Sequence, residues 1–195
     1  KSKTKINGSG RTDSGVNAWG QSANFFSNNE IKNKFRFLST INFYLKNYQI
    51  SVISIKKKDI KFHARHSAKK RQYEYIILNR IAKPSIEDKR SWLVKKNLDF
   101  YEMKKAIKYF VGTHNFTAFR ASSCDAKSPI KKIDLASIRK NGDKLKIKFD
   151  SKSFLQKQVR SMVGCLKYVG ENKWKPNMIK SVIKSKNRSK CAPPA

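Results

Sequence analysis

Acidic residues are scarce in this chain of 195 residues. Only 13 Asp and Glu stand against 45 Lys and Arg, which gives a formal net charge of +32 at pH 7. Charge of one sign at this level repels itself unless salt or a polyanion compensates it, so nucleic acid is the first candidate partner. A bias toward lysine in the composition would load the surface in the same way, so the charge alone identifies no binding site.

Long apolar runs and paired cysteines are also missing. The sequence has no stretch of about 18 apolar residues and no charged-then-apolar leader, so we expect neither a membrane span nor secretion. Its three cysteines, Cys124, Cys165 and Cys191, are odd in number and lack C-x-x-C spacing. We therefore expect reduced thiols in a cytoplasmic protein, rather than a disulfide framework or a zinc ribbon.

The histidines do not supply a metal site either. His63, His66 and His114 lack the ligand spacing that zinc sites use. No metal and no other cofactor is expected, and His114 is interpreted as a structural or RNA-contacting residue.

Apolar residues recur at helical spacing in three segments. Helices are predicted over residues 34–45, 99–110 and 154–169. Asp99 followed by Glu102 has the spacing of a capping box, Gly170 is a natural C-terminal stop, and Pro176 can open a short last helix.

Other segments carry strand signals. Strands are predicted over residues 20–26, 50–55, 71–78, 133–139 and 144–149. The last two flank Asn141-Gly142, a dipeptide suited to a tight hairpin turn. Since 38% of the residues are hydrophobic, the chain can build a packed core, and we expect an α+β fold with an antiparallel sheet covered by helices.

One stretch combines a carboxylate with several glycines. Residues 8–21 read GSGRTDSGVNAWGQ, and Asp13 is their only acidic residue. The spacing is not the G-x-G-x-x-G of a dinucleotide site, no phosphate-loop lysine is present, and the stretch is not a G-x-S-x-G elbow. A glycine-rich loop can bring Asp13 close to a bound ligand, because glycine adopts turns that other residues resist.

This stretch resembles the G-R-T-D-x-G-V-H-A-x-G-Q signature of the tRNA pseudouridine synthase A family. Further blocks resemble family segments in the same order: FHARHSA at 62–68 followed by RQYEY at 71–75, FVGTHNFTAFR at 110–120, and FLQKQVRSMVG at 154–164. Four blocks in order across nearly the whole chain make the resemblance specific. Asn17 replaces the family's usual histidine and Gln158 its common methionine, and neither departure removes a group that the chemistry needs.

The resemblance implies the catalytic residues. It makes Asp13 the catalytic carboxylate, either a nucleophile on the sugar or base or a base acting on the sugar. It gives Arg160 as the basic residue that pairs with Asp13. Tyr73 would stack on the target base and help to move a proton, while Tyr75 faces the same side of the predicted strand and stays an alternative.

The resemblance also implies RNA contacts. Arg11 would reach toward the vacated base stack or a phosphate, because a uridine in a stem must be turned out before its glycosidic bond is reachable. Arg65 is a candidate for binding a phosphate, although a surface salt bridge would explain it almost as well. Lysines at 56–58, 69–70 and 131–132 would follow the tRNA backbone or form solvated faces.

The enzyme that the resemblance implies isomerises uridine to pseudouridine at positions 38, 39 and 40 in the anticodon stem and loop of tRNA, as a homodimer without a cofactor. Its pseudouridine synthase fold has two RRM-like or ferredoxin-like subdomains, which would be residues 1–67, with the catalytic loop, and residues 68–195. The family has a strand and helix before the signature and a closing strand after the Ala-Pro segment. Both subdomains are therefore expected to be incomplete, with the chain truncated at both ends.

Two alternatives stay open. A basic RNA-binding module that keeps the fold without catalysing would suit an incomplete N-terminal subdomain, because a sheet short of a strand can fail to hold Asp13 and Arg160 together. A pseudouridine synthase paralogue that acts on other RNA positions would share every motif.

Overall fold

The computed structural model describes residues 4–10, 12–13, 15–85 and 90–195. They form two compact units, one made of Lys1–Thr12 with Ala18–Ala68 and the other of Asp13–Asn17 with Lys69–Ala195. Each unit is described by itself. The short segment that carries Asp13 belongs to the same unit as the C-terminal two thirds of the chain.

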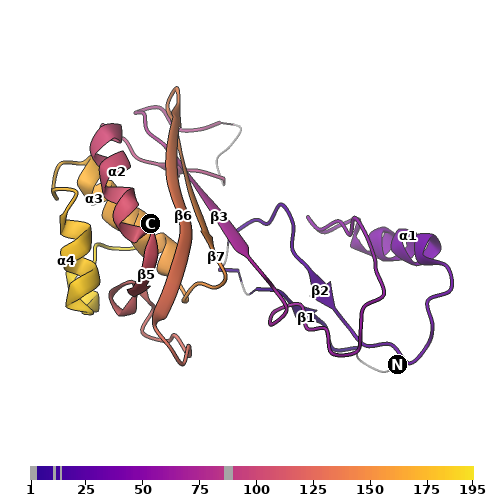
Figure 1. Cartoon of the computed structure of the whole chain (residues 1–195). Helices are drawn as coiled ribbons and strands as arrows, with labels where there is room; N and C mark the ends of the chain where they lie inside the picture. Colours follow the sequence, from indigo (N-terminus) through magenta and orange to yellow (C-terminus); the bar gives the residue numbers. More distant parts are fainter. Residues whose placement is uncertain (1–3, 11, 14, 86–89) are drawn as a thin grey trace. The chain divides into compact units, whose positions relative to one another are not determined.

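A five-stranded sheet forms the centre of the C-terminal unit (Figure 1). Its strands, in the order β4-β3-β7-β6-β5, are β4 (Trp92–Leu93), β3 (Arg71–Leu78), β7 (Lys144–Ser151), β6 (Ile130–Asn141) and β5 (Gly112–Asn115). All neighbouring pairs are antiparallel except β3 and β4, which are parallel. The expected antiparallel sheet is therefore a mixed one. The chain leaves β3 and returns in the same direction, so that Val94 N–H bonds to Leu78 at the edge of the sheet.

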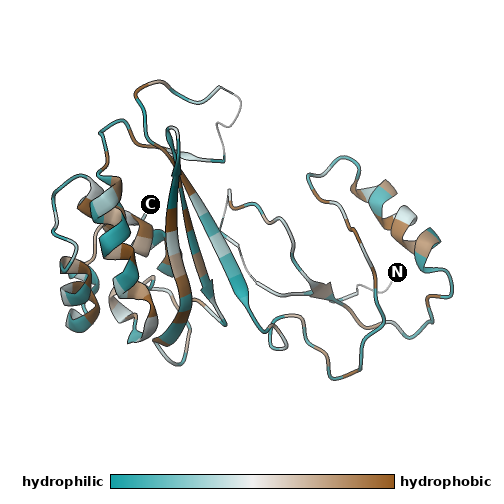
Figure 2. Ribbon diagram, turned by 45° about the horizontal axis from the view of Figure 1, so that its top comes forward, coloured by the Kyte–Doolittle hydropathy of each residue, from teal (hydrophilic) through white to brown (hydrophobic). Residues whose placement is uncertain are grey.

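The helices of this unit are α2 (Phe100–Ala106), α3 (Gln158–Gly170) and α4 (Met178–Ser185), and they gather on one side of the sheet (Figure 1). Hydrophobic and hydrophilic residues alternate along the strands beneath them (Figure 2). On β7, Leu145, Ile147 and Phe149 are buried, whereas Lys146 lies on the other face. This alternation places the core between the sheet and the helices, because successive strand side chains point to opposite faces.

The N-terminus of α2 forms half of the predicted capping box. The Asp99 side chain accepts a hydrogen bond from the Glu102 N–H at 3.0 Å, as a capping residue should. The Glu102 carboxylate pairs with Lys105 instead of reaching back. In a complete capping box the Glu102 side chain would accept a hydrogen bond from the Asp99 N–H. Here the Asp99 N–H donates instead to the Gly170 carbonyl of α3, at 2.8 Å.

Several boundaries differ from the predictions. The helix predicted over 99–110 is α-helical over Phe100–Ala106 and continues as a 3-10 helix over Ile107–Phe110, and the strand predicted over 133–139 spans Ile130–Asn141. Helix α3 begins at Gln158, four residues later than expected, because Lys157 has a left-handed backbone with φ of 60°. The hairpin loop consists of Gly142 and Asp143, since Asn141 still pairs with Lys144 in the ladder. Gly142 has φ of 54°, so the residue that needs glycine's freedom is the first of the loop.

The N-terminal unit contains β1 (Asn7–Gly8), β2 (Ala23–Asn24) and α1 (Lys34–Leu45). The prediction for α1 is confirmed, and the strand predicted over 20–26 shrinks to β2. The strand predicted over 50–55 is wrong. The Asn42 side chain binds both the N–H and the carbonyl of Val52, at 2.8 and 2.9 Å, and so takes the main-chain groups that a neighbouring strand would use. Across the described residues, no helix is long and apolar enough to cross a membrane.

Two buried carboxylates couple the C-terminal unit to pH. Asp150 lies on β7, with Lys70 Nζ and Gln72 Nε2 each 2.9 Å from its oxygens. Burial raises the pKa of Asp150, but these hydrogen bonds and the charges of Lys70 and Lys148 outweigh it and leave the pKa below its usual value. The pKa of Glu171 is lowered in the same way, against burial, by Lys167 and Lys173.

We predict that the protein loses stability in acid. A carboxyl group with a lowered folded-state pKa stabilises the fold above its unfolded pKa, near 4, and this contribution disappears as pH falls through the folded pKa. Urea unfolding at pH 7, 5 and 3 should show a loss concentrated below about pH 4. Asp150→Asn should lower stability at pH 7 by about 1–3 kcal/mol and flatten the pH dependence. An unchanged pH dependence in this variant would contradict the assignment.

Candidate active site

Asp13 lies in a tight turn. The Val16 N–H donates to the Asp13 carbonyl at 3.1 Å, and Gly15, the third residue of this turn, has φ of 79°. A type II turn has such an angle at its third position, which glycine adopts without a steric penalty. Part of the glycine-rich sequence therefore shapes the backbone that carries the carboxylate.

Arg160 forms an ion pair with Asp13. It is the third residue of α3, and its NH1 nitrogen lies 3.5 Å from Asp13 Oδ2. The side chains are 40% exposed for Arg160 and 31% for Asp13. A pair this open to solvent adds little to stability, about 0–1 kcal/mol, but a substrate can reach it.

The two candidate tyrosines lie on the helix side of β3. Tyr73 and Tyr75 alternate with exposed residues and share a face with buried Ile77. The Tyr73 ring packs edge-on against Phe154, with centroids 5.1 Å apart. Phe154 belongs to the segment between β7 and α3, so Tyr73 contacts the chain just before the helix of Arg160.

Tyr75 lies close enough to Arg160 for the charge to affect its pKa. Its ring packs against Trp92, with centroids 6.2 Å apart. Burial raises the pKa of the Tyr75 hydroxyl, and the nearby Arg160 charge partly offsets the rise. The Arg160 charge therefore acts on Tyr75. The sequence does not reveal this effect, because it distinguishes the two tyrosines only by their positions in the motif.

The two arginines expected to contact RNA are placed differently. Arg11 lies outside the described residues. Arg65 is an exposed residue of the N-terminal unit, and its main-chain N–H donates to His63 Nδ1 at 3.2 Å.

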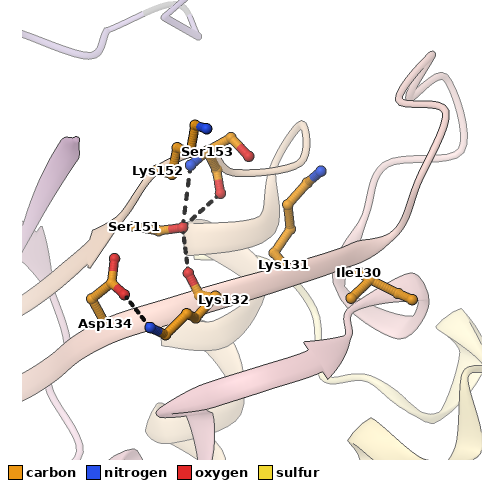
Figure 3. A pocket seen from close by; sticks show the side chains of 7 residues that line it. All are labelled: Ile130, Lys131, Lys132, Asp134, Ser151, Lys152 and Ser153. Atoms are coloured by element: carbon orange, nitrogen blue, oxygen red, sulfur yellow. Dashed lines mark hydrogen bonds and ion pairs between the residues drawn. The ribbon is translucent and has the colours of Figure 1, made fainter. Parts of the chain in front are cut away.

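A pocket of about 350 Å³ opens where β6 begins and β7 ends (Figure 3). It is lined by Ile130, Lys131, Lys132, Asp134, Ser151, Lys152 and Ser153. Lys132 turns toward Asp134, 3.5 Å away, whereas Lys131 points away from it. Lys131 and Lys152 have no carboxylate partner within the described part of the chain. The pocket thus contains Lys131, which belongs to one of the lysine runs in the sequence. It also contains Lys152, which belongs to none of them.

The described residues offer no cluster of three His, Cys, Asp or Glu side chains that could hold a metal ion. The Asp13 carboxylate pairs with the Arg160 guanidinium on α3, the Tyr75 ring lies within reach of the Arg160 charge, and the Tyr73 ring contacts Phe154 just before the helix. A carboxylate can attack an electrophilic carbon or accept a proton, and the guanidinium beside it can keep it oriented. An aromatic ring offers a face on which a base can stack.

Comparisons with known proteins place the chain in one family. A family model described as tRNA pseudouridine synthase matches residues 106–195. The tRNA pseudouridine synthase A of Pelagibacter ubique (strain HTCC1062) is 53% identical over 195 residues, which is 100% of this chain and 79% of that protein. The proteins of that name from Ehrlichia chaffeensis and Caulobacter vibrioides (strain NA1000 / CB15N) are 42% and 37% identical, over 95% and 99% of this chain and 76% and 78% of their own lengths. The chain therefore belongs to the tRNA pseudouridine synthase A family.

Proposed function

We propose that this protein isomerises uridine to pseudouridine in tRNA, at positions 38, 39 and 40 of the anticodon stem and loop. The observation that carries the proposal is the solvent-accessible ion pair of Asp13 and Arg160 in a chain of this family. The net charge of +32 suits a polyanionic substrate. We propose that tRNA is the substrate and that the reaction uses no cofactor.

The reaction exchanges one bond to the sugar for another. The bond between C1′ and N1 of uracil breaks, a bond between C1′ and C5 forms, N1 gains a proton and C5 loses one. The exchange involves no net oxidation or reduction. Asp13 would start it, as a nucleophile or as a base, and Arg160 would hold the carboxylate in place.

The other candidate residues would mainly bind the RNA. Tyr73 would stack on the everted uracil and help to transfer a proton, with Phe154 fixing its ring from the side. Arg11 and Arg65 would contact the RNA. Lys131 and Lys152, whose ammonium groups have no carboxylate partner among the described residues, would bind a backbone phosphate together with the Ser153 hydroxyl.

The finer architecture is also a proposal. We infer two subdomains of the RRM-like or ferredoxin-like type, residues 1–67 and 68–195, with the first incomplete. In support, α1 has no buried residue and Phe35 on it is 80% exposed, and the chain spans 76–79% of the length of the relatives reported above. On the basis of the family, we also propose that the protein is a homodimer. We propose that it acts in the cytoplasm, since tRNA is the substrate.

Asp13→Asn should abolish catalysis and leave tRNA binding intact. The substitution keeps the size of the side chain but removes the base or nucleophile, so we expect the single-turnover rate to fall by about 10³-fold or more. The rate is measured by tritium release from tRNA labelled at C5 of uridine, and the product is mapped by chemical probing. Undiminished product from Asp13→Asn would refute the catalytic assignment. If neither protein forms product while both bind tRNA, the non-catalytic RNA-binding module is favoured, and product at other positions favours the paralogue.

Substitutions at the two tyrosines separate stacking from proton transfer. Tyr73→Phe keeps the ring, so the dissociation constant of tRNA should stay within about twofold while the rate falls, whereas Tyr73→Ala should weaken binding by about 1–3 kcal/mol. Tyr75→Phe is the matched control on the same face of β3 and should retain a rate near wild type. A larger loss of rate in Tyr75→Phe than in Tyr73→Phe would transfer the catalytic role to Tyr75.

The pocket lysines should appear in the salt dependence of binding. For the double variant Lys131→Ala/Lys152→Ala, the slope of log affinity against log salt should decrease by about 1–2, because each neutralised phosphate releases counterions. The control is Lys132→Ala/Asp134→Ala, which removes the lysine together with its partner and keeps the net charge. Equal slopes for both double variants would show that the pocket binds no phosphate.

A further inference from the structure

We propose that Gly164, together with the segment that crosses it, holds Arg160 in the orientation in which it pairs with Asp13. The segment comprises residues 191–195, and we call it the strap. The proposal rests on the proposed function, because it assigns positioning residues to that reaction. Gly164 and the strap act through Arg160 rather than on the substrate.

The strap binds Arg160 at two points. The Ala195 N–H donates to the Arg160 carbonyl at 3.0 Å, and Arg160 Nε donates to the Ala195 carbonyl at 2.5 Å. One strap residue thus fixes both the main chain and the side chain of Arg160. With Nε engaged, a terminal nitrogen of the guanidinium is left to face Asp13.

Gly164 makes room for this contact. It lies four residues after Arg160 in α3, so the two positions share a face of the helix. A Cβ atom at residue 164 would lie 1.9 Å from the Pro193 carbonyl oxygen and 3.1 Å from the Pro193 carbonyl carbon. Both are backbone atoms, so no side-chain rotation relieves the overlap. A glycine within a helix costs about 1 kcal/mol relative to alanine, and here its effect is to let the strap approach the helix axis.

The strap is also anchored at its other end. Cys191 Sγ lies 3.4 Å from Cys165 Sγ, on the residue next to Gly164. Arg188 NH1 reaches the carbonyl oxygens of Ala118 and Ala192, 3.4 Å from each. Ala192 is only 2% exposed. Because the Cys191 end is held in this way, a Cβ at residue 164 would push the middle of the strap outward and carry Ala195 away from Arg160.

Such a displacement matters for the reaction because the strap acts on the charge partner of Asp13. A shift of about 1 Å in a catalytic constellation can cost about 10²-fold in rate, even when substrate binding is unchanged. The strap itself need not touch the tRNA. The expected signature is therefore a loss of rate without a loss of affinity.

The experiment compares Gly164→Ala with Gly170→Ala in the full-length protein. Residue 170 is the matched control, because it lies in the same buried helix and its added Cβ meets the flexible Met103 side chain, with Sδ at 2.7 Å. Gly164→Ala should lower the single-turnover rate about 10–100-fold, with the dissociation constant of tRNA within about twofold of wild type. Gly170→Ala should keep its rate within about twofold, whatever its melting temperature.

A second variant acts without adding bulk to the helix. Ala195→Pro removes the N–H that binds the Arg160 carbonyl. It should lower the single-turnover rate several-fold. If Gly164→Ala does not fold, this variant alone tests the positioning role of the strap. An unchanged rate in either folded variant overturns the positioning role, and so does an equal loss in Gly170→Ala. Absence of product from the wild type would instead overturn the proposed function, and this proposal with it.

Discussion

The ion pair of Asp13 and Arg160 is the constraint on which the candidate site depends. Asp13 lies in a short turn in which the Val16 N–H bonds to the Asp13 carbonyl and Gly15 has a positive φ. Arg160 lies on a helix packed against the core. The pair therefore connects a turn to a helix of the core, and the rest of the C-terminal unit keeps that helix in place.

Several elements could be predicted from local sequence because local physics decides them. Apolar spacing fixed α1 at Lys34–Leu45 and β3 at Arg71–Leu78, with the same bounds in the structure. The N-cap at Asp99 was predictable because one side chain satisfies a nearby N–H. The Asp13 and Arg160 assignments came from the resemblance, since neither composition nor spacing can join a loop near one end of a chain to a helix near the other.

The failures trace to contacts between distant residues. Residues 50–55 alternate like a strand, but Asn42 binds the Val52 main chain and no strand forms. The parallel pairing of β4 depends on the path of the intervening chain. Lys152 was not singled out because it stands alone in the sequence and joins Lys131 only when β6 and β7 align. The role of Gly164 is hidden for the same reason. It depends on the Pro193 carbonyl, which lies far along the chain.

The thiol pair beneath the strap has a consequence for handling and observing the protein. Cys165 has no exposed surface, while Cys191 is half-buried and lies on the strap itself. A reagent in solution must wait for the strap to lift before it can alkylate Cys165. The rate of that alkylation thus measures local opening of the segment next to the catalytic arginine, with no label added to the sequence.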